Sequence, residues 1–319
     1  MRVAWVLGGN GLLGSSLRSA IQRTESNLFI PAESFCWNNE SLLTVQLETA
    51  VEAFAKVVNT EKGWEIYWAA GVGTMGSIEA DLVIETRVLS KLLSFIESQP
   101  TLIATEGCFA FASSAGAIYA GATDDIINEN TSVAPTTAYG HEKLKQESLI
   151  SAFVIKHRRV TALFARISTL YGSGQATGKQ QGLIAEIARR ILRNQPIQIY
   201  VPFDTIRDYI TATDAAFTIL TTMRAISGKS GILVKIVASE QPTTIAEIIS
   251  VYKKIARRKP RVVTSASKLS SIYNRRIQFT SLVCLANERS SRTSLFVGIA
   301  QVMTAERAEF TQSRNKSYL

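Results

Sequence analysis

The sequence predicts an α/β protein built on a doubly wound parallel sheet, with a small C-terminal lobe. Short apolar runs alternate with stretches of helical spacing through the first half of the chain, a pattern typical of a parallel sheet covered on both faces. A glycine-rich turn joins the first run to the first helical stretch. Beyond Gly172 the alternation loosens, which indicates a smaller unit beside the sheet.

Composition and spacing predict the elements in order. Residues 2–7 (Arg-Val-Ala-Trp-Val-Leu) form a short apolar, β-rich run, and residues 12–22 carry apolar side chains at helical spacing. Next come a strand at 27–30, a helix at 47–58, a strand at 64–70 and a long helix at 78–98. The later elements are a strand at 108–112, a helix that carries Tyr139 and Lys143 and runs to His157, a strand at 159–167, a helix at 183–193, a strand at 197–201 and a helix at 245–254.

The first turn has the features of a dinucleotide site. It reads Gly8-Gly9-Asn10-Gly11-Leu12-Leu13-Gly14 and lies between a strand and a helix, the context that such a site requires. Gly8 permits a tight turn, Gly11 lets the backbone approach a pyrophosphate, and Gly14 lets helix and strand pack closely. The helix start at Leu12 and Leu13 adds free N–H groups and a partial positive charge. The spacing is G-x-x-G-x-x-G rather than the more familiar G-x-G-x-x-G.

Composition limits the classes of protein. The chain has 319 residues, 46% of them hydrophobic and 19% charged, as expected of a globular α/β domain with a smaller appendage. No apolar run approaches the roughly 18 residues of a membrane span, and no signal peptide precedes the first strand; we expect a cytoplasmic protein without a membrane partner. The net charge of +9 is compatible with an anionic substrate, and the absence of a recognised module argues against nucleic acid.

No metal site is expected. The cysteines, Cys36, Cys108 and Cys284, are far apart and lack the spacing of metal ligands. The two histidines, His141 and His157, are too few for a histidine-based metal centre. We interpret the cysteines as free thiols.

Tyr139 and Lys143 indicate the chemistry. Residues four apart on a helix lie on the same face, and an ammonium beside a phenol favours the phenolate. We therefore expect Lys143 to lower the pKa of Tyr139, so that the phenol can exchange protons near neutral pH. A dinucleotide site together with such a tyrosine is typical of a hydride-transfer enzyme.

Several further segments carry a family resemblance. They are Ala69-Ala70 after a strand, Ser113-Ser114-Ala115-Gly116-Ala117-Ile118-Tyr119, Tyr139 with Lys143, Arg166-Ile167-Ser168-Thr169-Leu170-Tyr171-Gly172 and Arg207-Asp208-Tyr209-Ile210 followed by Asp214-Ala215-Ala216. In this order and spacing, together with the glycine turn, they resemble the extended short-chain dehydrogenase/reductase family. The branch that they resemble is its NAD-dependent epimerase/dehydratase branch, which has a Rossmann-type sheet and acts on nucleotide sugars.

The resemblance implies a role for each matching residue. Tyr139 would be the acid/base at a sugar hydroxyl, and Lys143 would also hydrogen-bond the nicotinamide ribose. The cofactor would further contact Gly8, Gly11, Leu12, Leu13, Gly14, Ala69 and Ala70. Arg207 would hold the diphosphate of the sugar nucleotide, because its planar guanidinium donates two hydrogen bonds at once. Residues 1–172 would then be mainly the dinucleotide-binding domain and residues 173–319 mainly the substrate-binding lobe, with some segments returning to the sheet.

Three positions depart from the family pattern. The family has Ser or Thr at the position of Ala115, and Ser114, one residue earlier, is the candidate replacement for that catalytic hydroxyl; a simple strand-end turn is the alternative. Thr169 stands where the family has Asn, and its hydroxyl can still hydrogen-bond the substrate. Glu85 stands where an Asn is expected near the nicotinamide.

Glu33 bears on the choice of cofactor. It follows Gly14 by about 19 residues, and an acidic side chain there accepts hydrogen bonds from the adenosine ribose and repels a 2′-phosphate. This favours NAD and leaves NADP open. The alternative interpretation is that Glu33 is only a solvated carboxylate in a loop.

The leading hypothesis is an NAD-dependent nucleotide-sugar epimerase that oxidises a sugar hydroxyl transiently. A dehydratase is disfavoured, because Ala115-Gly116-Ala117 replaces the Thr-Asp-Glu that water elimination uses. The alternatives are an NAD(P)-dependent ketoreductase and a cofactor-binding regulator without turnover. The partner is a small nucleotide sugar, whose sugar and base the sequence does not name, and a homodimer stays open.

Overall fold

The protein is described here by a computed structural model. The structure describes residues 2–24, 27–59, 61–71, 73–174, 182–257, 259–265, 276–284 and 292–316. Within these ranges, no helix has both the length and the apolar composition needed to cross a membrane.

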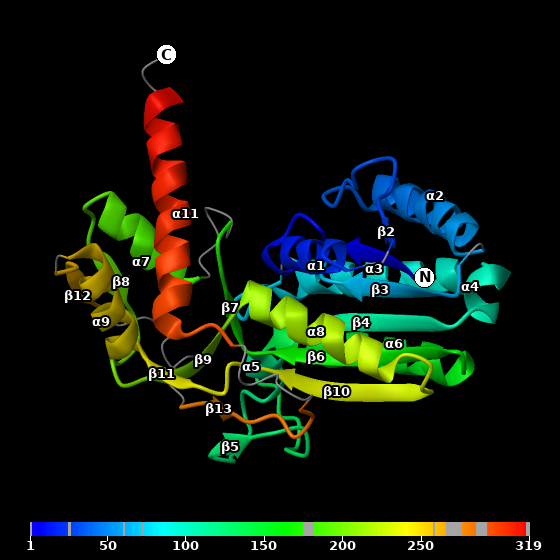
Figure 1. The fold of residues 1–319 in the computed structure, drawn as a ribbon. Helices are drawn as coiled ribbons and strands as arrows, with labels where there is room; N and C mark the ends of the chain where they lie inside the picture. Colours follow the sequence, from blue (N-terminus) through cyan, green and yellow to red (C-terminus); the bar gives the residue numbers. More distant parts are fainter. Residues whose placement is uncertain are drawn as a thin grey trace.

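A six-stranded parallel sheet forms the centre of the larger part of the molecule (Figure 1). Its strands lie in the order β10-β6-β4-β3-β1-β2, and every neighbouring pair is parallel. The strands are β1 (Arg2–Leu7), β2 (Asn27–Phe29), β3 (Gly63–Trp68), β4 (Gly107–Ser114), β6 (Val160–Ile167) and β10 (Gly231–Val237). The predicted doubly wound parallel sheet is confirmed.

Helices cover both faces of this sheet. Alternate residues of β1 enter different cores: Val3, Trp5 and Leu7 pack with one set of helices, whereas Ala4 and Val6 pack with the other. The first set is α2 (Glu40–Val58), α3 (Glu79–Glu97) and α6 (Ala138–Lys156). The second set is α1 (Leu12–Gln22) and α8 (Ala212–Ile226), which cover the face turned to the viewer in Figure 1. Burial on both faces explains why the strands are mainly apolar rather than alternating.

The smaller part is built from short strands. β7 (Thr169–Tyr171), β9 (Ile206–Thr211) and β11 (Pro242–Thr244) form one sheet, and β8 (Ile197–Ile199) pairs with β12 (Val262–Thr264). With them, α7 (Leu183–Leu192), α9 (Ile245–Ala256) and α11 (Leu295–Lys316) enclose a separate apolar core. The remaining short elements are α4 (Pro100–Ala104), α5 (Ala115–Ile118), β5 (Ile126–Ile127) and β13 (Gln278–Phe279).

Some elements differ from the sequence prediction. The helix predicted at 47–58 begins at Glu40, because Asn39 accepts a hydrogen bond from the Leu42 N–H and caps it. The helices α4, α8 and α11 and the edge strand β10 were not predicted. In β10, Lys235 interrupts an otherwise apolar run, yet it is fully buried and its ammonium reaches the Val283 carbonyl.

The course of the chain crosses between the two parts. β10, a strand of the large sheet, and α8, a helix packed on that sheet, come after residue 172. β7 of the smaller part already begins at Thr169. The assignment of residues 1–172 to cofactor binding and 173–319 to substrate binding stays a prediction.

Candidate active site

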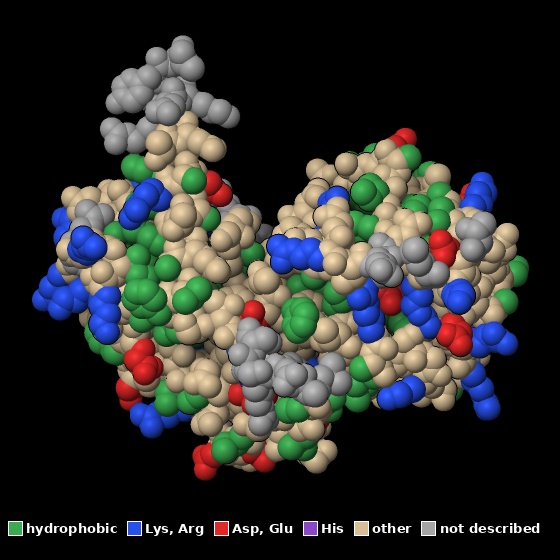
Figure 2. Space-filling model, in the orientation of Figure 1, with side chains coloured by type: hydrophobic (Ala, Val, Ile, Leu, Met, Phe, Trp, Pro, Cys, Tyr) green, Lys and Arg blue, Asp and Glu red, His purple; other side chains and the backbone are tan. Residues whose placement is uncertain are grey.

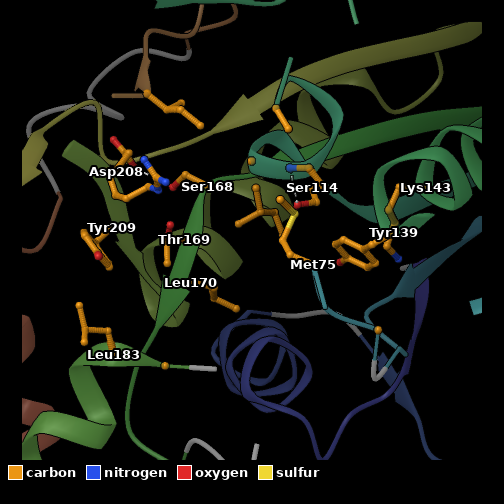
Figure 3. Close-up of a pocket in the computed structure, with 18 of the residues that line it drawn as sticks. Met75, Ser114, Tyr139, Lys143, Ser168, Thr169, Leu170, Leu183, Asp208 and Tyr209 are labelled. Carbon is orange, nitrogen blue, oxygen red and sulfur yellow. Dashed lines mark hydrogen bonds between the residues drawn. The ribbon is translucent and has the colours of Figure 1, made fainter. Parts of the chain in front are cut away.

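A cavity of about 500 Å³ lies at the carboxyl ends of the parallel strands, and residues from both parts line it. The surface is hollowed between the two parts (Figure 2), and Figure 3 shows the residues around the cavity. In open α/β sheets ligands bind at this edge. The predicted site residues that line the cavity are Leu13, Ala69, Ala70, Ser114, Tyr139, Lys143, Thr169 and Arg207.

The glycine turn is held tightly against the end of β3. Gly8 has a φ of +78°, which favours glycine, and its carbonyl accepts the Gly11 N–H at 2.9 Å. A Cβ on Gly8 would lie 2.6 Å from the Ala69 carbonyl oxygen, and a Cβ on Gly14 would lie 2.1 Å from the Gly8 carbonyl oxygen. The turn therefore excludes side chains at both positions, and it brings Ala69 and Ala70 beside the start of α1.

The start of α1 fits a phosphate group. The helix begins after Gly11, and among the described side chains none caps it and no acidic residue lies in its first turn. The N–H groups at Leu12, Leu13 and Gly14 belong to the first turn, where an α-helix has no intrahelical acceptor for them. These residues fit the pyrophosphate of a dinucleotide, because such a terminus supplies both donors and a partial positive charge.

Tyr139 lies in the first turn of α6. Thr137 caps this helix by accepting the Gly140 N–H at 3.2 Å. Gly140 permits a close approach to the segment after β4, since a Cβ there would lie 2.6 Å from the Ala117 carbonyl oxygen. As a result, the Tyr139 ring points toward Ser114 and Met75 (Figure 3).

The pKa of Tyr139 is raised, not lowered. Burial of the phenol is the largest cause, the negative charge of Glu85 adds to it, and a hydrogen bond with Ser114 opposes both. The Lys143 ammonium lies 5.6 Å from the centre of the Tyr139 ring and donates to Gln146 Oε1 at 3.1 Å. The expectation of a lowered pKa is therefore wrong for this arrangement: burial and Glu85 raise the pKa of Tyr139, and Ser114 rather than Lys143 is the side chain that lowers it.

Lys143 is itself deeply buried beneath the cavity. Burial lowers the pKa of its ammonium, whereas the carboxylates of Glu85 and Glu147 raise it. It also lies over the ring of Phe111, 4.9 Å from the ring centre. The sequence prediction that Tyr139 and Lys143 lie together at the site agrees with their position on the cavity wall.

Ser114 and Ala115 have opposite environments. Ser114 ends β4, lines the cavity and accepts the Ala117 N–H on its Oγ at 3.3 Å. That leaves its own O–H to donate toward Tyr139, which agrees with the lowering effect of Ser114 on the pKa of Tyr139. Ala115 is fully buried in a core with Ile118 and Tyr119. At this turn, therefore, the serine and not the alanine faces the cavity.

The opposite wall comes from β7, β8 and β9. Thr169 and Arg207 line it, and Arg207 donates to the Ile206 carbonyl at 2.9 Å. Next to Arg207, the buried Asp208 accepts from Ser168 Oγ at 2.6 Å and from the Ser239 N–H at 2.8 Å. Burial raises the pKa of Asp208, and these hydrogen bonds lower it.

Sequence reasoning assigned no role to two residues of this wall. Ser168, between β6 and β7, and Asp208, on β9, line the cavity and hydrogen-bond each other. Both residues lie in segments that carry the family resemblance, so the sequence already indicated that these segments lie near the site. Their contact cannot be predicted from the sequence, because it joins residues that are 40 positions apart in the chain.

Glu33 and Glu85 occupy different places. Glu33 is exposed in the loop after β2 and is absent from the cavity wall, so its effect on cofactor choice stays a prediction. Glu85 lines the cavity, and its Oε1 accepts the Gly73 N–H at 2.7 Å.

Two curated relatives share part of their sequence with this chain. A dTDP-4-dehydro-6-deoxyglucose reductase from Escherichia coli is 34% identical over 110 residues, which is 34% of each chain. A dTDP-L-rhamnose 4-epimerase from Burkholderia thailandensis is 28% identical over 96 residues, 30% of this chain and 26% of that protein. The matches thus span about a third and about a quarter of these relatives.

Over its whole length the chain has the fold of a solved epimerase. The UDP-glucose 4-epimerase of Thermotoga maritima, solved with UDP-glucose, superimposes with a TM-score of 0.75 at 18% identity, covering 97% of this chain and 100% of that chain. The sequence family described as "NAD dependent epimerase/dehydratase family" matches residues 4–236. This match includes the glycine turn, Tyr139 and Arg207, so NAD is the cofactor that the family match indicates. The chain belongs to the NAD-dependent epimerase/dehydratase family of enzymes.

Proposed function

We propose that the protein is an NAD-dependent nucleotide-sugar epimerase that oxidises one sugar hydroxyl transiently and restores it with inverted configuration. The observation that carries the proposal is the arrangement around Tyr139. Its phenol lies in a cavity with the Ser114 hydroxyl, the glycine turn borders the same cavity through Leu13, and Arg207 faces it from the other wall. Related enzymes that act on nucleotide sugars, by their names, support the substrate class.

The cofactor would be held by the turn and the adjoining strand end. The N–H groups of the first turn of α1 would bind the pyrophosphate, with Gly8, Gly11 and Gly14 keeping side chains out of its way. Ala69 and Ala70 would contact the cofactor where the end of β3 meets this turn. Lys143 would hydrogen-bond the nicotinamide ribose. Bound NAD would accept a hydride from the sugar carbon and return it.

Tyr139 would move the proton of the sugar hydroxyl. As a phenolate, its Oη would take the proton when the hydroxyl becomes a carbonyl, and the resulting phenol would give the proton back when the hydroxyl is restored. The Ser114 hydroxyl, which lies within hydrogen-bond reach of Tyr139, would donate to the oxygen of the reacting sugar hydroxyl. This bond would hold the sugar oxygen beside the phenol. The hydrogen bond from Ser114 favours the phenolate of Tyr139, because it lowers the pKa of that phenol.

The sugar nucleotide would be held by the opposite wall. The Arg207 guanidinium suits a diphosphate, because its fork donates two parallel hydrogen bonds. Thr169 is exposed on β7 in the same wall as Arg207, and its hydroxyl would hydrogen-bond the substrate. A dehydratase is not proposed, since the Ala115-Gly116-Ala117 segment next to Tyr139 supplies no carboxyl group for eliminating water.

A ketoreductase is the second candidate, and the reductase among the relatives favours it. Epimerisation and ketone reduction differ in whether reduced cofactor is consumed. An epimerase uses its cofactor catalytically, whereas a reductase consumes one reduced cofactor per turnover.

The test combines product and cofactor analysis. The purified protein is incubated with NAD and a panel of UDP- and dTDP-hexoses, and also with NADH or NADPH and the corresponding 4-keto sugars. Proton NMR then identifies the products, and absorbance at 340 nm follows the cofactor. We expect an epimer to form without net change in NADH. Consumption of reduced cofactor in proportion to product would replace the proposal with the ketoreductase.

A further inference from the structure

Glu85 is a charged residue of the cavity wall whose side chain is fixed by backbone contacts. It lies on α3, half-buried, and its Oε1 accepts the Gly73 N–H at 2.7 Å. Its Oε2 would lie 3.1 Å from a Cβ on Gly71. The carboxylate is therefore pressed against the segment that follows β3.

This position is next to Tyr139 and Lys143. A Cβ on Gly73 would lie 3.2 Å from both Cδ2 and Cε2 of the Tyr139 ring, so Gly73 stands between the carboxylate and the phenol. The negative charge of Glu85 raises the pKa of Tyr139 and also that of Lys143. Both effects require that the carboxylate be close to each of them.

Glu85 also balances the charge of Lys143. Two carboxylates act on that ammonium, Glu85 and Glu147. Glu147 already has a partner, because both of its oxygens accept from the Arg166 guanidinium at 3.1 and 2.7 Å. Without Glu85, this end of the cavity would therefore carry the net positive charge of Lys143.

We propose that Glu85 makes the site prefer oxidised over reduced nicotinamide. The proposal rests on the proposed function, because Tyr139 as the acid/base at the reacting carbon puts the nicotinamide at this end of the cavity. The oxidised ring carries a positive charge and the reduced ring carries none. A carboxylate in a low-dielectric wall stabilises the charged ring, whereas an unbalanced Lys143 would repel it.

The experiment measures the affinity of the protein for NAD and for NADH separately, by isothermal titration calorimetry near neutral pH. Wild type is compared with Glu85→Gln, which keeps an oxygen to accept the Gly73 N–H but removes the charge. We expect the ratio of the dissociation constants, NAD over NADH, to rise about tenfold in this variant. Weaker binding of NAD should account for most of the change.

Two further variants separate charge from shape. Glu79→Gln removes an equal charge from the exposed start of the same helix and should leave the ratio unchanged. Glu85→Asp keeps the charge while shortening the side chain, and should change the ratio much less than Glu85→Gln. Thermal unfolding of each variant checks that it is folded.

The outcomes are distinct from those of the function test. An unchanged ratio in folded Glu85→Gln, or an equal change in Glu85→Asp and Glu85→Gln, overturns the role of Glu85 even if the protein is an active epimerase. The expected shift supports that role even if no sugar of the panel is converted. If wild type binds neither NAD nor NADH, the cofactor site and the role of Glu85 fail together.

Discussion

The two walls of the cavity are built in different ways. On the sheet side, Leu13, Ser114 and Tyr139 stand at the ends of buried parallel strands or in the first turn of helices packed on them. The opposite wall comes from the short strands β7, β8 and β9, which belong to two separate small sheets. The sheet side is therefore framed by one large sheet, whereas the other side combines two small ones.

From this difference we expect the sheet side to carry the chemistry and the opposite wall to recognise the substrate. A rigid wall suits the chemistry, because acid/base groups need accurate placement. A wall of short elements can change its side chains without disturbing the sheet, which suits recognition of the substrate. Substitutions on the sheet side should therefore alter turnover or cofactor binding, and substitutions on the opposite side should alter the KM for the sugar nucleotide.

The largest effect is expected from Tyr139→Phe. Loss of the phenol hydroxyl removes the proton transfer and should lower kcat by a factor of about 10²–10⁴, while the dissociation constant for NAD stays the same. Tyr200→Phe is the control, because it removes a phenol hydroxyl from the opposite wall and should leave kcat close to wild type. Steady-state kinetics and a cofactor titration measure both, and wild-type turnover in Tyr139→Phe would remove the tyrosine from the mechanism.

A smaller loss of turnover is expected from Ser114→Ala. One hydrogen bond made mainly in the transition state contributes a factor of about 10²–10³ to kcat. Adding Ala115→Ser in this background should restore nothing, since residue 115 is enclosed in the core. A single-turnover measurement tests this directly. If the rate of the chemical step does not change in Ser114→Ala, Tyr139 and Lys143 alone perform the acid/base work.

Arg207→Ala should act on substrate affinity. Removing a charged hydrogen-bond donor from the diphosphate should raise the KM for the sugar nucleotide about tenfold or more, with NAD affinity unchanged. Arg207→Lys keeps the charge but not the fork, and should recover only part of the loss. A fall in NAD affinity of equal size would contradict the separation of the two walls.

The smallest effect is expected from Glu33→Ala. If Glu33 repels the 2′-phosphate of NADP, its removal should increase NADP affinity a few-fold, with little effect on NAD. The carboxylate is exposed, so salt should weaken the effect. Titrations of both cofactors at low and high salt give the ratio, and a constant ratio would assign Glu33 to the solvated loop.

Local patterns predicted the first part of the fold well. The bounds of β1 and α1 agree with the prediction, because an apolar strand, three glycines and a helical repeat follow one another within a short stretch. Prediction failed for α8 and β10. β10 pairs with β6, far away in the sequence, and its buried Lys235 resembles a surface residue when only the sequence is read.

The candidate site shows the same limit. The helix with Tyr139 and Lys143 was predicted from spacing, but the predicted lowering of the pKa of Tyr139 was wrong. That direction depends on burial and on Glu85, which lies on another helix. The choice between Ser114 and Ala115 likewise required the turn after β4, since only the backbone path decides which of two adjacent side chains faces the cavity.

The sequence by itself determined the glycine turn between β1 and α1, the placing of Tyr139 and Lys143 on one helix, and the family. These features depend on neighbours a few residues apart, whose geometry follows from the helix repeat and from the freedom of glycine. Only the tertiary structure decided that Glu85 lies near Tyr139 and Lys143, that Ser114 hydrogen-bonds Tyr139 and that Arg207 lies on the opposite wall. Burial and Coulomb interactions act between atoms that are close in space, whatever their separation along the chain.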